Sequence, residues 1–298
     1  MIYSAEIHEP VQVLSEDLVL VDWGPMTLTI AAWRRGRARP VMAAKAARSA
    51  LDSLQVLADF QGYMKLLTGS LPEDRPLPRV VERARKAARA VDGGLTSLAA
   101  VAGAVADEVA LSAANLGADK VIVNNGGDLA LILKGRTTAT VGLKAPRSSE
   151  MVGRLTLKAG DRIRGVASSG WEGRSFSRGI ADLVTVWAEN ASLADAAATF
   201  IAGQVVVRDS KIRQVRAREV DPLSDLGHAL VTVAVGPLSP SQCRQALKQG
   251  LIATQNLFKA HLIRGCLIKV QGNMLIFDPD RIFSGSSREG GCSLLNEV

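Results

Sequence analysis

The stretch VIVNNGGDLALIL, from Val121 to Leu133, decides the fold, because two strand-like apolar runs flank the polar cluster Asn-Asn-Gly-Gly-Asp. One interpretation is a β-hairpin with its turn at Asn125-Gly126, since Asn-Gly readily takes the positive φ values that such turns need. The other is a ligand site, because two adjacent glycines before Asp128 exceed what a turn requires and leave bare backbone beside a carboxylate. The residues alone leave both interpretations open.

Helices and strands are expected on both sides of this hairpin. A first hairpin is predicted over residues 17–33, turning at Gly24-Pro25, and a last one around Gly272-Asn273. Apolar spacing and turn residues predict the remaining elements. The strands are expected at 119–124, 128–134, 137–143, 153–158, 163–170 and 181–188, and the helices at 43–67, 79–91, 98–117, 193–203 and after Ser239-Pro240.

This order of elements predicts an α+β (mixed α/β) fold in which Ala-rich helices pack on a largely antiparallel sheet. No repeat of 20–50 residues and no convincing linker divides the chain. A single domain over residues 1–280 is therefore the simplest prediction. Residues 281–298 read as a flexible C-terminal tail.

Composition limits the classes of function. Among 298 residues, 47% are hydrophobic, but aromatic residues are few, so the core must be mainly aliphatic. The N-terminus has no signal-peptide pattern, and Asp107 and Glu108 interrupt the apolar stretch from Leu95 to Leu111, which argues against a membrane span. Three scattered cysteines suit reduced thiols, so a cytoplasmic location is expected.

The net charge of +7 comes from separate basic patches without interleaved aromatic residues. Such patches offer no stacking platform, so nucleic-acid binding is not expected. An anionic small-molecule ligand explains the charge equally well. The Ala-rich helices could pack internally or against a second subunit, which leaves a homo-oligomer open.

Two further stretches have residues suited to a site. The loop SSGWEGRSFSRGIAD, from Ser168 to Asp182, combines small residues with arginines and suits anion binding, although a flexible surface loop is the alternative. In ADAAAT, Asp195 and Thr199 are four residues apart and share one face of a helix. Their oxygens could hold a hard cation such as Mg²⁺, and the alternative is a carboxylate stabilised near a helix N-terminus.

Taken together, "NNGGD", the Ser-Gly loop and "VTVWAENASLADAAATFIAG" resemble the ApbE-like superfamily, whose best-known members are magnesium-dependent FAD:protein FMN transferases. The sequence is most similar to a bacterial and archaeal branch of that superfamily without an agreed biochemical function. The resemblance covers most of residues 15 to 280 and implies an ApbE-like fold with Mg²⁺ and FAD or FMN as cofactors. The positions that match the superfamily's patterns are Gly126, Gly127, Asp128, Ser169, Gly170, Asp195 and Thr199.

Two departures concern the activity itself. Thr96 stands about where flavin transferases have an Asp that holds FAD, and Ala102 about where they have a Lys. Their His-Ile-Ile-Asp-Pro segment has no clear counterpart here. Losing a charged hydrogen-bond partner costs roughly 1.5–3 kcal/mol, so FMN transfer is not the expected activity.

The expected function is that of a cytoplasmic protein with a pocket for an anionic, flavin- or nucleotide-like molecule, and an Mg²⁺-dependent transferase is one form of this function. A non-catalytic ligand-binding accessory protein of a metabolic enzyme is the alternative. Asp195 and Thr199 are predicted to hold the metal, and Asp182 to serve either as a general base or as a structural hydrogen-bond acceptor. The predicted ligand-binding residues are Thr96, Asn125, Gly126, Gly127, Asp128, Ser168, Ser169, Gly170 and Arg174.

Overall fold

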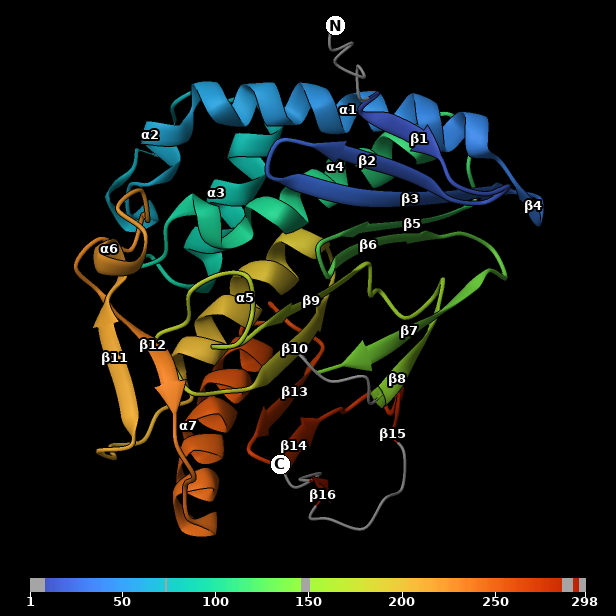
Figure 1. Cartoon of the computed structure of the whole chain (residues 1–298). Helices are drawn as coiled ribbons and strands as arrows, with labels where there is room; N and C mark the ends of the chain where they lie inside the picture. The colour runs from blue at the N-terminus through green and yellow to red at the C-terminus, as the bar shows by residue number, and fades with distance from the viewer. Residues whose placement is uncertain (1–8, 73, 146–150, 286–291, 295–298) are drawn as a thin grey trace, which may run out of the picture.

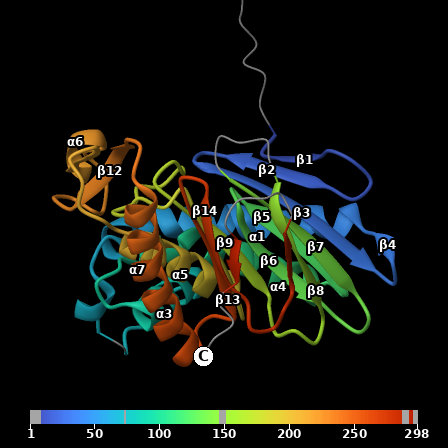
Figure 2. The same ribbon diagram turned by 90° about the horizontal axis from the view of Figure 1, so that it is seen from below.

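The computed structural model describes residues 9–72, 74–145, 151–285 and 292–294. A long, largely antiparallel sheet forms the middle of the molecule (Figure 1). Helices pack on one face of this sheet, and a small second sheet packs on the other (Figure 2). The predicted α+β fold class is therefore confirmed.

Within the described residues the large sheet has eleven strands in the order β1-β2-β3-β5-β6-β9-β10-β13-β14-β16, with β4 paired to β3. Neighbouring strands run antiparallel except β14 and β16, which are parallel. The strands are β1 (Val11–Val13), β2 (Val19–Trp23), β3 (Met26–Arg34), β4 (Arg37–Ala38), β5 (Lys120–Asn125), β6 (Asp128–Leu133), β9 (Gly165–Ser169), β10 (Leu183–Ala188), β13 (Gly265–Val270), β14 (Asn273–Phe277) and β16 (Cys292–Leu294).

The helical layer consists mainly of Ala-rich helices, because small side chains let the helix axes approach the sheet and each other closely. A separate two-stranded sheet, β11 (Ile212–Arg216) and β12 (Leu230–Val235), stands beside this layer. The helices are α1 (Pro40–Asp59), α2 (Gln61–Met64), η1 (Thr68–Ser70), α3 (Arg79–Val91), η2 (Ser97–Ala100), α4 (Val101–Asn115), α5 (Ala191–Gln204), α6 (Ala217–Val220) and α7 (Pro240–Lys259).

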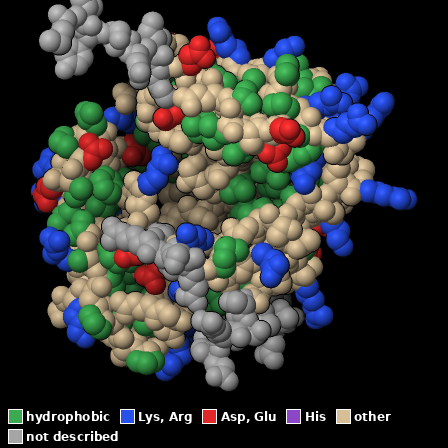
Figure 3. Space-filling view, turned by 45° about the vertical axis from the view of Figure 1, so that its right-hand side comes forward, with side chains coloured by type: hydrophobic (Ala, Val, Ile, Leu, Met, Phe, Trp, Pro, Cys, Tyr) green, Lys and Arg blue, Asp and Glu red, His purple; other side chains and the backbone are tan. Residues whose placement is uncertain are grey.

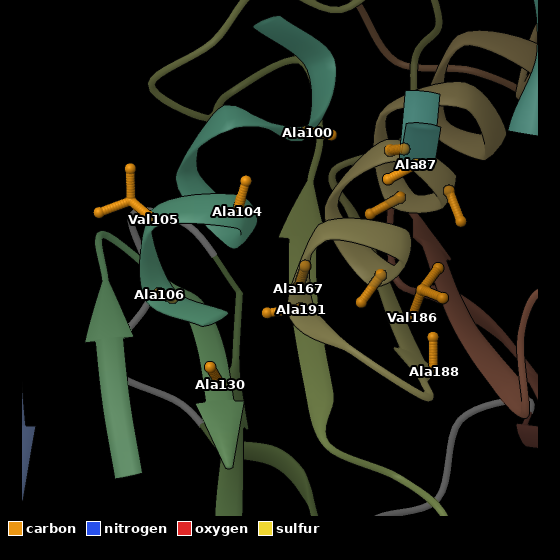
Figure 4. Close-up of a cluster of buried hydrophobic side chains, with 14 of the residues drawn as sticks. Ala87, Ala100, Ala104, Val105, Ala106, Ala130, Ala167, Val186, Ala188 and Ala191 are labelled. Carbon is orange, nitrogen blue, oxygen red and sulfur yellow. The ribbon is translucent and has the colours of Figure 1, made fainter. Parts of the chain in front are cut away.

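Helices α4 and α5 lie very close to each other, and their buried surfaces are mainly alanine (Figure 4). A Cβ atom added to Gly103 would lie 2.3 Å from the Ala191 carbonyl oxygen, so the two backbones touch there. The buried Asp107 carboxylate of α4 accepts hydrogen bonds from the backbone N–H groups of Ala191 and Ser192, at 2.9 and 3.0 Å. One helix therefore caps the other across their contact.

The opposite face of the sheet is covered by β7 (Thr138–Lys144), β8 (Met151–Lys158) and β15 (Phe283–Gly285). Buried residues alternate with exposed residues along β7, as expected for a sheet with one face in a core. Leu155 and Leu157 of β8 are fully buried against Trp187 of β10 in this second core.

Several element boundaries differ from the sequence-based predictions. The β5–β6 turn is Gly126-Gly127 and the β13–β14 turn is Gln271-Gly272, each one residue from the predicted pair, because these residues have the positive φ values. The predicted tail contains strands β15 and β16, and its other residues from 286 on lie outside the described part of the chain.

One helical stretch, Ser97–Asn115, is long and apolar enough by composition to cross a membrane. More than half of it, 56%, is buried inside the protein against the sheet and its neighbouring helices. The central helix of a water-soluble protein has the same properties, so this stretch is accounted for by the core that it fills.

Replacing Gly103 by Ala is expected to lower stability, because the new methyl group must displace the α5 backbone. Overpacking of this kind costs about 1–3 kcal/mol. Gly62→Ala is the matched control, since Gly62 lies in helix α2 with no atom within 4 Å of its added Cβ. Chemical denaturation should show a large decrease in the free energy of unfolding for Gly103→Ala and little change for Gly62→Ala. Equal stabilities would contradict the close α4–α5 contact.

Candidate functional site

A cavity of about 1110 Å³ lies between α1, the start of α4, the β5–β6 turn, β7 and the loop that follows β9. Figure 3 looks onto a hollow in the surface with hydrophobic side chains and Lys or Arg side chains around it. Three segments that are distant in sequence meet in this cavity. The predicted site residues that line it are Asn125, Gly126, Gly127, Asp128, Ser168, Ser169, Gly170, Arg174, Asp195 and Thr199.

The β5–β6 turn both reverses the chain and faces the cavity. Gly126 and Gly127 have φ values of +67° and +116°, which a residue with a side chain rarely adopts. The Gly127 N–H donates to Asn124 Oδ1 at 2.8 Å, and Asn125 Nδ2 donates to the Ala102 carbonyl at 3.1 Å. The turn is therefore tied to the start of α4, and the two interpretations of "NNGGD" are compatible.

Arg174 lies directly against this turn. A Cβ atom added to Gly126 would be 2.8 Å from Arg174 Nη1, so the glycine provides the space for the guanidinium group. The positive charge of Arg174 favours the ionised form of Asp128. The loop after β9 thus brings the positive charge of Arg174 close to Asp128, the first residue of β6.

Asp128 has a carboxylate that the described protein atoms satisfy only in part. Its Oδ1 atom is buried and has no hydrogen-bond partner among them. Burial raises the pKa of Asp128 to about 7, although the Ser168 backbone N–H and Arg174 act in the opposite direction. Buried acceptors normally have a partner, so Asp128 Oδ1 is available to a ligand, an ion or a water molecule.

Asp195 is the second carboxylate of the cavity. Its Oδ2 atom accepts a hydrogen bond of 2.9 Å from the Gly103 N–H, so the close α4–α5 contact also positions this group. Burial raises the pKa of Asp195 well above its usual range, and the nearby charge of Asp128 raises it further. Thr199 follows one helical turn later and also lines the cavity. Two carboxylates and a hydroxyl group therefore face one space.

Strand β9 and the residues after it form another part of the lining. Ser168 pairs with Thr185 of β10, and their hydroxyl groups are 2.8 Å apart. Gly170 packs against the neighbouring backbone, because its Cβ position lies 2.5 Å from the Asp182 carbonyl oxygen. Ser169 and Gly170 thus present small groups and backbone to the cavity.

Two predicted site residues are not among those that line the cavity. The Asp182 carboxylate accepts hydrogen bonds from the Gln271 backbone N–H at 2.6 Å and from Trp171 Nε1 at 3.3 Å. This position matches the structural alternative for Asp182, since the carboxylate anchors the loop. The Thr96 hydroxyl donates to the Asp225 carboxylate.

Sequence reasoning missed the cavity wall formed by α1 and β7, which includes Leu54, Leu57 and Leu143. These residues look like ordinary core positions, and no signal in the sequence separates them from core. Within the described part of the chain, no group of three or more His, Cys, Asp or Glu side chains suits a metal ion. A cation at Asp195 would therefore depend on two carboxylates, a hydroxyl group and oxygen atoms of water or ligand.

Comparison with known proteins gives the relatives of this chain. The family model described as AbpE bacteria matches residues 12–276. A UPF0280 protein of Methanopyrus kandleri is 38% identical over 162 residues, which cover 53% of this chain and 65% of the relative. A UPF0280 protein of Methanosarcina barkeri is 33% identical over 185 residues, covering 62% of this chain and 70% of that protein. The chain thus spans less than two thirds of the Methanopyrus relative.

Solved structures of flavin transferases are more distant. The apo form of the flavinyl transferase ApbE from Pseudomonas stutzeri aligns with a TM-score of 0.42 and 15% identity, covering 75% of this chain and 96% of that one. The flavin transferase ApbE from Vibrio cholerae aligns with a TM-score of 0.36 and 15% identity, covering 76% of this chain and 98% of that one.

The raised pKa values of the two carboxylates predict how stability depends on pH in the absence of divalent cations. The folded protein keeps protons that the unfolded chain loses above about pH 4. The free energy of unfolding should therefore fall as pH rises toward 7 and above, by about 1.4 kcal/mol per unit of pKa shift. Thermal unfolding in EDTA from pH 5 to pH 8 measures this slope.

The Asp195→Asn variant keeps an acceptor for Gly103 but loses the charge, so it should flatten this slope and raise Tm at pH 8 by about 2 °C or more. Asp52→Asn is the control, because the Asp52 side chain is 65% exposed on α1. Parallel curves for wild type and Asp195→Asn would show that the pKa of Asp195 is not raised in the folded protein.

Substitutions at two turn glycines, one in the β5–β6 hairpin and one between β6 and β7, distinguish the effect of backbone strain from the effect of the Arg174 contact. Gly126 and Gly135 have φ values of +67° and +62°, but only Gly126 has the Arg174 guanidinium at its Cβ position. Replacing either by Ala should cost about 1 kcal/mol of stability through strain. Only Gly126→Ala should also weaken the binding of inorganic pyrophosphate, by about tenfold. Equal pyrophosphate affinities in calorimetry would mean that Arg174 does not bind the anion.

Proposed function

Because the chain belongs to the AbpE bacteria family within the ApbE-like superfamily, we propose that it binds an Mg²⁺-complexed, phosphate-bearing small molecule of the flavin or nucleotide class. The cavity beside the β5–β6 turn is the proposed site. One observation carries the proposal: the carboxylates of Asp128 and Asp195 line the same cavity, and a buried oxygen of Asp128 has no partner among the described atoms.

A divalent cation is the group that best fits this arrangement. The two carboxylates repel each other and both lose hydration in the cavity, so both resist ionisation. A cation held by these groups would reduce both penalties. Mg²⁺ prefers oxygen ligands and commonly keeps water or phosphate oxygens in its coordination sphere, so Asp195 and Thr199 need supply only part of that sphere.

The groups around the two carboxylates suit a phosphate that binds together with such a cation. Arg174 can donate two hydrogen bonds to one anionic group in a fixed geometry. The glycine turn leaves its backbone open beside Asp128, and Ser168 and Ser169 add hydroxyl donors. When bound, Mg²⁺ would neutralise phosphate charge and polarise a phosphorus–oxygen bond.

The residues around the cavity also indicate whether the protein converts the ligand that it binds. A transferase needs a base within reach of the attacking group. Asp182, the predicted base, already accepts two hydrogen bonds, and no histidine is among the described residues of the cavity lining. These contacts favour the second candidate function, a ligand-binding accessory protein that does not turn its ligand over.

We also propose a cytoplasmic location. Cys243 and Cys266 are free thiols buried in the helical core, and burial raises the pKa of Cys266 to about 12. Such thiols are unreactive and suit a reducing compartment. Fractionation of cells that produce the full-length protein, followed by immunodetection, tests the location.

Calorimetric titration with FAD, FMN and ADP, each with and without Mg²⁺, tests the proposed binding. At least one ligand should bind in an Mg²⁺-dependent way, and Asp195→Ala should weaken that binding by 100-fold or more, because it removes a charged ligand of the cation. Thr199→Val should weaken it by about tenfold. Asp52→Asn should have no effect, since its carboxylate is exposed and outside the cavity lining.

Equal affinity of Asp195→Ala and wild-type protein at every Mg²⁺ concentration would refute the cation site. Incubation of the tightest ligand with the protein, followed by mass spectrometry, separates the two candidate functions. Release of a nucleotide product favours a transferase, and an unchanged ligand favours the accessory protein.

A further inference from the structure

The cavity has two chemically different parts. The carboxylates, Thr199 and Arg174 form a polar centre at the β5–β6 turn. Beside it lies an aliphatic wall that we define by six residues from β3, α1, η2 and α4. They are Met26, Leu54, Leu57, Leu98, Val101 and Val105.

The aliphatic wall begins directly beside the polar centre. Val101 and Val105 lie in the first turns of α4, on either side of Ala102 and Gly103. The Ala102 carbonyl accepts a hydrogen bond from Asn125, and the Gly103 N–H donates to Asp195. A ligand anchored by its phosphate at the polar centre would therefore meet apolar surface with the atoms that follow the phosphate.

The wall has little with which to recognise a flat ring. No Phe, Tyr, Trp or His is among the described residues that line the cavity, so stacking on an aromatic side chain is not available. Strand β3 and helices α1, η2 and α4 contribute no polar side chain to the described lining, and helix α2, which follows α1, contributes that of Gln61. Recognition of a base or flavin ring normally combines stacking with several hydrogen bonds to the ring edge.

The size and exposure of the wall suit a flexible chain. The cavity, at about 1110 Å³, is slightly larger than the usual range of about 300–1,000 Å³ for small-molecule sites. Leu54, Leu57, Leu98 and Val101 are only partly buried in the protein, so they have apolar surface left to cover. Covering that surface is the main gain that the hydrophobic effect offers here.

We propose that the ligand is a diphosphate whose organic part is an aliphatic chain of the prenyl type. Its diphosphate group is held at the polar centre with Mg²⁺, and its chain lies along the aliphatic wall. This inference rests on the proposed Mg²⁺–phosphate site, but it assigns to that site an aliphatic diphosphate in place of a flavin or a nucleotide.

The test is calorimetric titration of the full chain, with Mg²⁺, against pyrophosphate and the diphosphates of five-, ten- and fifteen-carbon prenyl chains, with FAD and ADP alongside. Each added five-carbon unit should tighten Kd by about tenfold or more while wall remains to be covered, because every buried methylene group favours binding. The ten-carbon diphosphate should bind more tightly than ADP or FAD.

Two wall variants and a control locate the chain. Leu57→Asn and Val101→Asn should weaken binding of the ten-carbon diphosphate by tenfold or more, while pyrophosphate affinity stays within about twofold. Leu223→Asn is the control, since Leu223 is 73% exposed and not among the residues of the cavity lining. Thermal unfolding of each variant shows whether it is folded under the conditions of the titration.

Each outcome decides one of the two proposals. If pyrophosphate binds only with Mg²⁺ but prenyl diphosphates bind no more tightly than pyrophosphate, the chain inference is wrong and the cation site stands. The chain inference also fails if FAD or ADP binds more tightly than the ten-carbon diphosphate. Absence of Mg²⁺-dependent binding for every ligand would overturn the proposed function and, with it, this inference.

Discussion

The close contact between α4 and α5 is the constraint on which the rest of the structure depends. Gly103 lets the two backbones touch, and the same residue donates its N–H to Asp195. One turn further along α4, Asp107 binds the first N–H groups of α5. Packing, capping and the placement of a site carboxylate therefore all come from one helix pair.

The alanine content of both helices follows from this contact. Larger side chains would separate the helix axes and break the hydrogen bonds that cross between them. The energy of the contact comes from many small buried groups rather than from a few large ones, as Figure 4 illustrates. A chain with so few aromatic residues can still be well packed in this way.

Much of the fold could be predicted from sequence, because strand alternation, helical spacing and turn residues are local signals. Helix α3 has the predicted bounds, and the hairpin around Gly126 is one residue from its predicted turn. The exact position of the turn is ambiguous in a sequence with a glycine pair, because several neighbouring residues accept positive φ values. The long-range pairing of β3 with β5 had no local signal.

Part of the site could also be predicted from sequence, for a similar reason. Polar residues in an unusual local sequence, such as Asp128 after two glycines, can be recognised as candidate site residues. The hydrogen bonds of Asp182 with Trp171 and Gln271 depend on how distant segments pack, so its two predicted roles could not be separated beforehand. The aliphatic wall could not be predicted, because leucines of a core and leucines of a pocket have the same pattern in a sequence.

The capping of α5 limits the ways in which this protein can hold an anion. In many nucleotide-binding proteins a helix N-terminus offers its free N–H groups to phosphate oxygens. Here Asp107 already accepts from Ala191 and Ser192, and the Asn190 side chain accepts from Leu193. With its first N–H groups bonded to a carboxylate and an amide of the protein, the N-terminus of α5 has few donors left for a ligand. An anion in the cavity would therefore have to be held by side chains such as Arg174 and not by this helix end.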